Sequence, residues 1–283
     1  MSLTKHPQLG KINHLRVVKQ MDFGVYLDAQ TMGEVLLPLR YVPENCQIND
    51  TLDVFLYKDS NDRLIATTET PYVMVDECAC LKVVDTNRVG AFLDWGLPKD
   101  LFVPFSEQNG RMEIGKSYVV NVYIDDVTER IAATARLDGW LSEDGVYFKP
   151  YQAVDLLICG QTELGYKAVI NHTHLGLIYK NEVFQDLRYG QRLKGFIKTI
   201  RADKKIDLCL QLPAKDTQDE LMQKILAYLR DNNGVSHITD KSPPQVIYQQ
   251  FHVSKKNYKR ALGKLYKQRK ISIEKDSIEL LNP

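Results

Sequence analysis

Over roughly the first two-thirds of the chain, apolar and polar residues alternate in short runs, as they do in half-buried β-strands. In residues 52–57 the side chains of Leu52, Val54 and Leu56 fall on one face of such a strand. Turn-forming residues at 59–62 end that run. The pattern predicts five strands in residues 10–69, at 15–18, 23–28, 35–37, 52–57 and 64–67. Five short strands within a segment of this length are typical of a small OB-fold barrel.

The spacing of residues in this stretch occurs three times along the chain. A glycine is followed after 14 residues by a proline or tyrosine and after 41 residues by an isoleucine. The three sets are Gly24, Pro38 and Ile65; Gly90, Pro104 and Ile131; and Gly165, Tyr179 and Ile206. Internal repetition at a fixed spacing indicates one structural unit used repeatedly. We therefore expect further barrels in residues 79–137 and, after a turn-rich connector, in 153–212.

The period of the apolar residues becomes helical after Pro213. Leu221, Ile225 and Leu229 share one helix face, and a second helix is expected to open at the prolines 243–244. Ser254 is a suitable cap for a third helix, and two strands are expected in 271–280. Three helices and a hairpin predict a winged helix-turn-helix.

The predicted fold is mainly β with a C-terminal α+β domain: three tandem five-stranded OB-fold barrels followed by a winged helix. The expected domains are 1–70 for the first barrel, 71–137 for the second, 138–213 for the connector and third barrel, and 214–283 for the winged helix.

The net charge of +1 hides an asymmetry. From Ala214 onward there are 13 Lys and Arg against 8 Asp and Glu, a net +5, which leaves −4 for the remainder. A basic end on an acidic body favours a polyanionic partner. No apolar run is long enough to span a bilayer and the N-terminus lacks a signal-peptide pattern, so we expect a cytoplasmic protein without a membrane partner.

Two aromatic residues flank a glycine in the first repeat, at Phe23-Gly24-Val25-Tyr26. Strict strand alternation would place Phe23 and Tyr26 on opposite faces, whereas a bulge at the glycine would bring both to one face. Exposed aromatic rings on an OB barrel stack against unpaired bases. The alternative is that both rings pack in the barrel core.

The pattern Phe-Gly-x-aromatic-apolar-Asp, the apolar trio at 35–37 and the spacing Asp59-x-x-x-Arg63 resemble the RNA-binding domain of ribosomal protein S1. In that family two aromatics, a histidine that ends the third strand and a late Asp and Arg form the RNA face. The resemblance implies RNA contacts by Phe23, Tyr26, Asp59 and Arg63, with Pro38 at the histidine position.

The other two repeats keep less of this pattern. The resemblance carries over to Phe92, Asp126 and Arg130 in the second, where Val89 replaces one aromatic and Pro104 the histidine. In the third, Tyr179 takes the histidine position and basic residues add charge: Lys167, Lys198, Arg201, Lys204 and Lys205. The third barrel is thus expected to hold phosphates more than to stack bases.

Residues 254–270, the expected third helix, contain eight basic residues and no acidic one. In a helix-turn-helix this is the recognition helix, and its charge suits a phosphate backbone. The predicted contacts are Lys255, Lys256, Lys259, Arg260, Lys264 and Lys267. The alternative is that these charges only form a solvated face.

The order of S1-like modules and a winged helix resembles the conserved virulence factor B (CvfB, YitL-like) family of Gram-positive bacteria. That resemblance implies binding of RNA and post-transcriptional regulation of gene expression, including that of virulence factors. Single-stranded RNA is the expected ligand, because unstacked bases are what exposed aromatic rings can hold. Two other interpretations stay open: a DNA-binding regulator acting through the winged helix, and a scaffold on the ribosome or an RNA-processing complex.

We expect no enzyme activity, cofactor or metal. The pair His172 and His174 lacks a third ligand at a suitable spacing, and the five cysteines show no zinc-ligand pattern. The sequence contains no glycine-rich phosphate loop.

Overall fold

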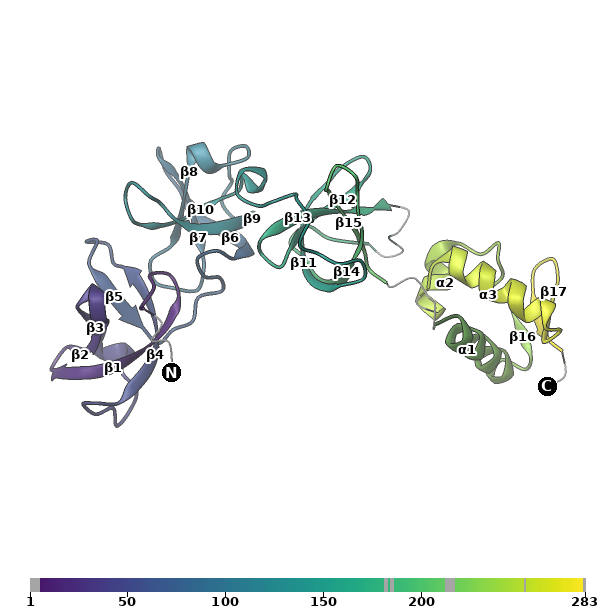
Figure 1. Cartoon of the computed structure of the whole chain (residues 1–283), viewed down its shortest axis with the longest axis horizontal. Helices are drawn as coiled ribbons and strands as arrows, with labels where there is room; N and C mark the ends of the chain where they lie inside the picture. Colours follow the sequence, from purple (N-terminus) through teal and green to yellow (C-terminus); the bar gives the residue numbers. More distant parts are fainter. Residues whose placement is uncertain (1–5, 181–182, 184–185, 212–216, 252, 282–283) are drawn as a thin grey trace. The chain divides into compact units, whose positions relative to one another are not determined.

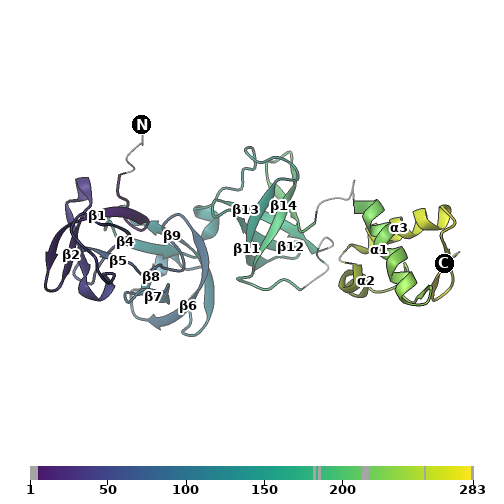
Figure 2. The ribbon, with the colours of Figure 1, turned by 90° about the horizontal axis from the view of Figure 1, so that it is seen from below.

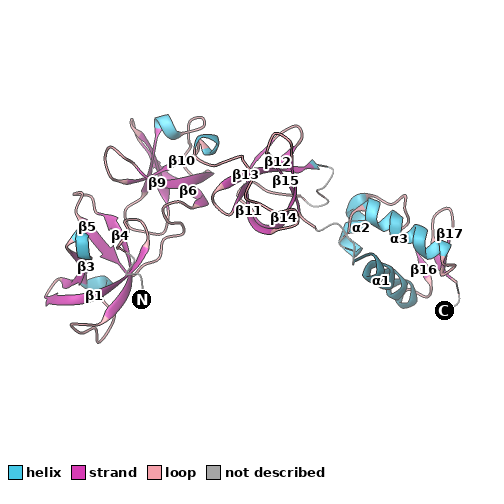
Figure 3. Cartoon of the chain, in the orientation of Figure 1, coloured by secondary structure: helices cyan, strands magenta, loops and turns pink. Residues whose placement is uncertain are grey.

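The computed structural model describes residues 6–180, 183, 186–211, 217–251 and 253–281 (Figure 1). The chain divides into two compact units. One contains Met1–Glu143 and Val169–Leu175, and the other contains Asp144–Ala168 and Gly176–Pro283. Strands make up the barrels, and the three α-helices of the described residues lie in the C-terminal domain (Figure 3).

The first barrel is closed, and its five strands follow the order β1-β2-β3-β5-β4. The strands are β1 (Ile12–Met21), β2 (Gly24–Asp28), β3 (Glu34–Pro38), β4 (Thr51–Lys58) and β5 (Leu64–Thr67). Neighbours are antiparallel except β3 and β5, which meet in parallel at Leu36 and Ile65 and close the barrel. Alternate apolar side chains such as Leu15, Val17 and Leu27 fill its interior.

The second and third barrels, which Figure 2 shows as ribbons along with the first, repeat this strand order. The second contains β6 (Cys78–Thr86), β7 (Gly90–Asp94), β8 (Leu101–Pro104), β9 (Ser117–Ile124) and β10 (Ile131–Thr134). The third contains β11 (Ala153–Gln161), β12 (Gly165–Ile170), β13 (His174–Tyr179), β14 (Arg192–Ile200) and β15 (Ile206–Cys209). Three closed barrels in the described residues confirm the fold predicted from the repeated spacing.

The repeated glycine has one physical cause in all three barrels. It begins the second strand, where the backbone of the third strand comes too close for a side chain. A Cβ atom at Gly24 would lie 2.2 Å from the Leu37 carbonyl oxygen. At Gly90 and Gly165 it would lie 2.3 and 2.0 Å from the equivalent carbonyl oxygens. This contact also explains the spacing of 14 residues between the glycine and the proline or tyrosine of each repeat. Each of these carbonyls belongs to the residue just before that proline or tyrosine.

Replacing Gly24 by alanine should destabilise the first barrel by about 1–3 kcal/mol, because the new methyl group meets backbone atoms that cannot move away. Gly24 also has φ +151°, a conformation that disfavours a side chain. Urea denaturation followed by circular dichroism measures the change. Gly33→Ala is the matched control, because Gly33 has φ +81° but no described atom within 4 Å of its added Cβ. An equal loss in both variants would contradict the steric explanation.

The first and second barrels share one hydrophobic core. Phe55 and Tyr57 of β4 lie in the same buried cluster as Trp95 and Leu97, which follow β7. The rings of Phe55 and Trp95 meet edge to face, with centroids 5.7 Å apart. The Lys99 ammonium group donates hydrogen bonds to the carbonyls of Lys58, at 3.0 Å, and Asp59, at 2.8 Å. Burial lowers the pKa of Lys99. The two barrels therefore form one packed structure.

The C-terminal domain is a winged helix, as predicted. It contains α1 (Thr217–Asp231), α2 (Pro244–Phe251) and α3 (Lys255–Lys267), with a sheet in the order β16-β18-β17. The strands are β16 (Val235–Ser236), β17 (Ile271–Ile273) and β18 (Ile278–Leu280). Ser254 caps α3 by accepting a hydrogen bond from the Asn257 amide at 3.1 Å. The pattern missed β16, which is only two residues long.

The domain boundary predicted at 213/214 lies outside the described residues. None of the helices in the described part of the chain has the length and apolar character needed to cross a membrane.

Candidate nucleic-acid interface

Two aromatic rings stand together on the surface of the first barrel. Phe23 is 53% exposed and Tyr26 is half-buried, and neither belongs to the barrel core, so the core alternative is wrong. Their ring centroids lie 6.4 Å apart with the planes at 84°. The Lys19 ammonium group lies 5.6 Å from the centre of the Tyr26 ring. We call Lys19, Phe23 and Tyr26 the aromatic platform.

A hairpin turn creates the platform. Asp22 and Phe23 form the turn between β1 and β2, and Met21 pairs with Gly24 at its base. Phe23 therefore lies in the turn, and only Tyr26 follows the alternation of side chains between the two faces of β2. The two rings come together as expected, but through this turn and not through a bulge between them. The register irregularity lies instead in the partner strand β1, between Val17 and Lys19.

The predicted acidic and basic pair of the first barrel forms an ion pair in the β4–β5 loop. Arg63 donates to one Asp59 carboxylate oxygen from Nε at 3.0 Å and from Nη2 at 2.8 Å. The other oxygen accepts from the backbone amides of Asn61 and Arg63. Partial burial works to raise the pKa of Asp59, but the hydrogen bonds from Arg63 outweigh it and lower that pKa. The pair shapes this loop and leaves the Arg63 side chain 73% exposed.

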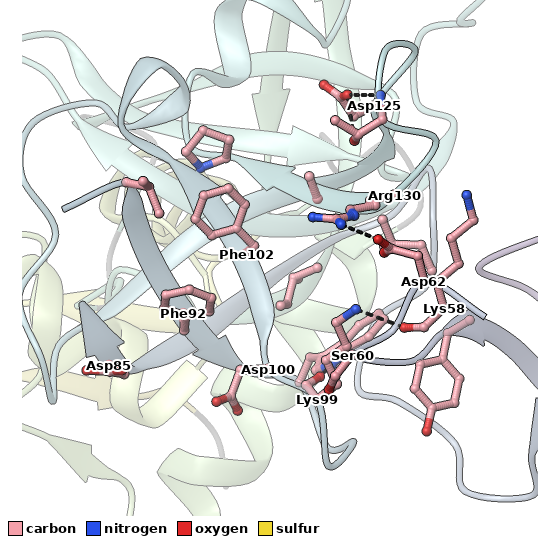
Figure 4. Close-up of a pocket in the computed structure, with 18 of the residues that line it drawn as sticks. Lys58, Ser60, Asp62, Asp85, Phe92, Lys99, Asp100, Phe102, Asp125 and Arg130 are labelled. Carbon is pink, nitrogen blue, oxygen red and sulfur yellow. Dashed lines mark hydrogen bonds and ion pairs between the residues drawn. The ribbon is translucent and has the colours of Figure 1, made fainter. Parts of the chain in front are cut away.

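The second barrel carries a pocket of about 720 Å³ where Phe92 and Phe102 lie side by side (Figure 4). The two ring centroids are 5.2 Å apart. Phe92 occupies the position of Tyr26, since it pairs with Phe102 across β7 and β8 as Tyr26 pairs with Leu36. Phe102 was not among the predicted site residues. The same cross-strand position in the first repeat holds an aliphatic residue, so no aromatic pattern marked it.

The first barrel supplies one wall of this pocket. Its β4–β5 loop contributes Ser60 and Asp62, and Asp62 forms an ion pair with Arg130 of the second barrel (Figure 4). The hydrogen bond from Arg130 lowers the pKa of Asp62. Arg130, predicted to face RNA, thus joins the two barrels and also lines the pocket.

The structure places Asp125, and not Asp126, at the position of Asp59. The Asp125 amide donates to the Arg130 carbonyl at 2.9 Å, as the Asp59 amide does to the Arg63 carbonyl. The loop is one residue longer in the second barrel. The Asp125 carboxylate accepts from the amide and hydroxyl of Thr128, each at 2.7 Å, and these bonds lower its pKa. Asp126 is exposed.

The pocket has an acidic rim, because Asp85 and Asp100 also line it. Burial, and then the charges of Asp94 and Asp85, raise the pKa of Asp100. Basic side chains line it as well, since Lys58, Lys99 and Arg130 belong to the same lining. The pocket thus combines two aromatic rings with side chains of both charges.

In the third barrel a buried carboxylate takes part in the expected site. Asp207 is only 7% exposed, lies 3.5 Å from the Nε atom of Arg201 and accepts a hydrogen bond from Tyr179. Burial raises the pKa of Asp207, while Arg201 and Lys198 oppose the rise. The first and second repeats have Ala66 and Ala132 at the position of Asp207, so comparison of the repeats did not indicate a carboxylate there.

The stability contributed by Asp207 should fall as the pH rises. In the unfolded chain its pKa is about 3.9. Its folded value is higher, so between the two the folded protein binds more protons than the unfolded chain. The urea midpoint of the unaltered protein should therefore fall as the pH is raised from acidic to neutral, and Asp207→Asn should remove this slope. The exposed Asp186→Asn serves as the control for lost charge, because Asp186 is not among the charges that shift the pKa of Asp207. A slope that survives in Asp207→Asn would contradict this assignment.

Several basic residues of the third barrel have acidic partners. Lys204 lies 3.0 Å from Asp144, and Arg201 lies 3.4 Å from Asp203. Lys167, Lys198 and Lys205 also have partners. The positive charge predicted for this barrel is thus partly compensated within it.

Helix α3 presents most of its basic residues to solvent. Five of the six predicted contacts are exposed: Lys256, Lys259, Arg260, Lys264 and Lys267. Lys255 differs, because its ammonium group donates to the carbonyls of Lys241, at 3.1 Å, and Ser242, at 3.0 Å. It therefore ties α3 to the segment before α2. Lys259 lies 3.5 Å from Asp240.

His172 and His174 lie where the turn after β12 leads into β13. His174 begins β13 and its Nδ1 atom is hydrogen-bonded to the Thr173 hydroxyl at 2.8 Å. Within the described ranges, no three His, Cys, Asp or Glu side chains are grouped closely enough to hold a metal ion.

Two family models match the chain. One is described as an S1 domain and matches residues 9–69, and the other is a CvfB-like winged helix domain that matches residues 223–280. The protein YitL of Bacillus subtilis is 30% identical over 272 residues, which are 91% of this chain and 88% of YitL. The chain belongs to the CvfB/YitL-like family.

A second member, conserved virulence factor B of Staphylococcus epidermidis, is 26% identical over 283 residues, covering 96% of this chain and 94% of that protein. A crystal structure from Streptococcus pneumoniae, described as a multidomain protein with nucleic acid binding domains, is 24% identical and covers 96% of this chain and 98% of its own. The TM-score between the two structures is 0.42.

The domains of this CvfB/YitL-like chain support nucleic-acid binding. S1 barrels and winged helices are nucleic-acid-binding domains, and neither matched family is one of enzymes. The two matches also lie on the two parts of the chain that expose the aromatic platform and the basic face of α3.

Proposed function

We propose that this protein binds single-stranded RNA and regulates gene expression after transcription, in the cytoplasm. The aromatic platform of the first barrel carries the proposal. Its exposed Phe23 ring and half-buried Tyr26 ring offer stacking surfaces, and stacking requires bases that are not already paired. The two rings stand together, with centroids 6.4 Å apart, and the Lys19 ammonium group lies 5.6 Å from the centre of the Tyr26 ring, so one site offers both stacking surfaces and a positive charge.

The pocket of the second barrel supports the same proposal. Phe92 and Phe102 offer a second place for an unpaired base, and the shared core fixes it relative to the aromatic platform. One strand that occupies both places binds more tightly than either site alone, because the second contact is intramolecular. By analogy with its relatives named for virulence, we include virulence genes among those regulated.

Fluorescence anisotropy with a labelled uridine oligonucleotide tests this function. The proposal expects binding of the single strand at low salt, weakening as salt is added because phosphate contacts release counterions. An RNA hairpin with a short loop should compete less well, since its bases are paired. Equal or better competition by the hairpin would overturn the preference for single strands, and no binding of either RNA would overturn the function.

A second candidate function is binding of duplex DNA through α3, which is favoured by the exposed basic residues of that helix. The major groove of B-DNA admits an α-helix, whereas that of duplex RNA is too narrow. A DNA duplex that displaces the uridine oligonucleotide completely, and at lower concentration than unlabelled RNA, would favour this candidate.

A further inference from the structure

Gly263 lies in the middle of α3, where glycine weakens a helix relative to alanine. Its backbone does not require glycine, because Gly263 is not among the residues with positive φ. Packing does not require it either: an added Cβ atom at Gly263 would meet no described atom within 4 Å. By contrast, a Cβ at Gly24 or Gly90 would collide with backbone. The fold of the described residues therefore gives no reason for glycine at this position.

The surroundings of Gly263 suggest a reason outside the chain. Residues three and four positions away are its neighbours on a helix surface. They are Lys259, Arg260, Tyr266 and Lys267, and all four are exposed. The buried stripe of α3, which includes Tyr258 and Leu262, lies on the opposite side. Gly263 is thus a partly exposed stretch of backbone without a side chain, and its neighbours on the helix surface are three cations and one aromatic ring.

We propose that Gly263 allows the sugar–phosphate backbone of a bound nucleic acid to lie directly against α3. Without a side chain at this point, a strand can approach the helix closely enough for Lys259, Arg260 and Lys267 to reach its phosphates together. The inference rests on the proposed function and extends it to a contact surface on the winged helix. Asp240, the described acidic partner of Lys259, would give up that ion pair to a phosphate.

A methyl group at Gly263 should have opposite effects on stability and on binding. Gly263→Ala should raise the melting temperature of the domain by a few degrees, because alanine favours the helix and has room. It should weaken nucleic-acid binding by about threefold to tenfold, since the strand is held away from the cations. Gly263→Leu should weaken binding further. The rise in stability separates this effect from misfolding.

The experiment uses the full chain, differential scanning calorimetry and anisotropy with three labelled probes: a uridine oligonucleotide, an RNA hairpin and a DNA duplex. The probe whose binding is weakened most by Gly263→Ala identifies the kind of nucleic acid whose backbone lies against α3. Lys267→Gln is the positive control, and Lys224→Gln, on the exposed side of α1, is the matched control that should change nothing.

Each outcome is decisive. Unchanged binding in both Gly263 variants, with weaker binding in Lys267→Gln, would overturn the role of Gly263 and leave the proposed function intact. A lower melting temperature in Gly263→Ala would show that the fold itself needs the glycine, and would also overturn the inference. No binding of any probe by the unaltered chain would instead contradict the proposed function.

Discussion

Replacing Phe23 and Tyr26 together by alanine should weaken binding of single-stranded RNA by about 30-fold or more. Base stacking on one aromatic ring contributes about 1–3 kcal/mol, so losing two rings costs at least about 2 kcal/mol. The loss should appear as faster dissociation of a labelled uridine oligonucleotide, because the rings act after the strand has arrived. Stopped-flow measurements of association and dissociation provide the test.

The same double variant should keep its melting temperature, because neither ring belongs to the core of the barrel. Tyr147→Ala is a matched control, since it removes an aromatic ring that is 87% exposed in another part of the chain. Binding as tight as that of Tyr147→Ala would contradict the role of the platform. A large fall in stability would mean that the rings are structural.

Replacing Trp95 by alanine should destabilise the first and second barrels together by about 3–5 kcal/mol. Trp95 is only 3% exposed and packs against Phe55 of the first barrel, so its loss leaves a cavity at the junction. Urea denaturation gives the change in stability. Hydrogen exchange then shows where it acts, and amides in both β4 and β9 should lose protection.

Trp140→Ala is the control for loss of an indole ring from the same unit. Trp140 is 45% exposed and packs on Tyr123, with centroids 4.1 Å apart, so its loss should cost clearly less. The outcome that contradicts a shared core is loss of protection by Trp95→Ala in the second barrel alone. In that case the two barrels would unfold independently.

The repeated fold could be predicted because its cause is local. The close approach at Gly24 forces glycine at that point of each repeat, and fixed strand lengths then place Pro38 and Ile65 at constant distances. The winged helix was predicted for a similar reason, since an apolar stripe marks each helix and the Ser254 cap marks the start of α3.

The pocket could not be predicted, because its parts come from distant positions in the sequence. Asp62 and Arg130 are separated by 68 residues, and nothing in either repeat indicates that one loop completes the other barrel. The loop between β9 and β10 is one residue longer than that between β4 and β5, so the equivalent of Asp59 is Asp125 and not the predicted Asp126. For Lys255, charge alone could not show that backbone carbonyls already hold its ammonium group.

Photo-crosslinking tests most directly the claim that the aromatic platform holds unpaired bases. A uridine oligonucleotide is bound to the full chain and irradiated, and the crosslinked peptides are mapped by mass spectrometry. We predict crosslinks at Phe23 or Tyr26, and their loss in the double alanine variant. Crosslinks confined to α3, with none in the first barrel, would contradict it.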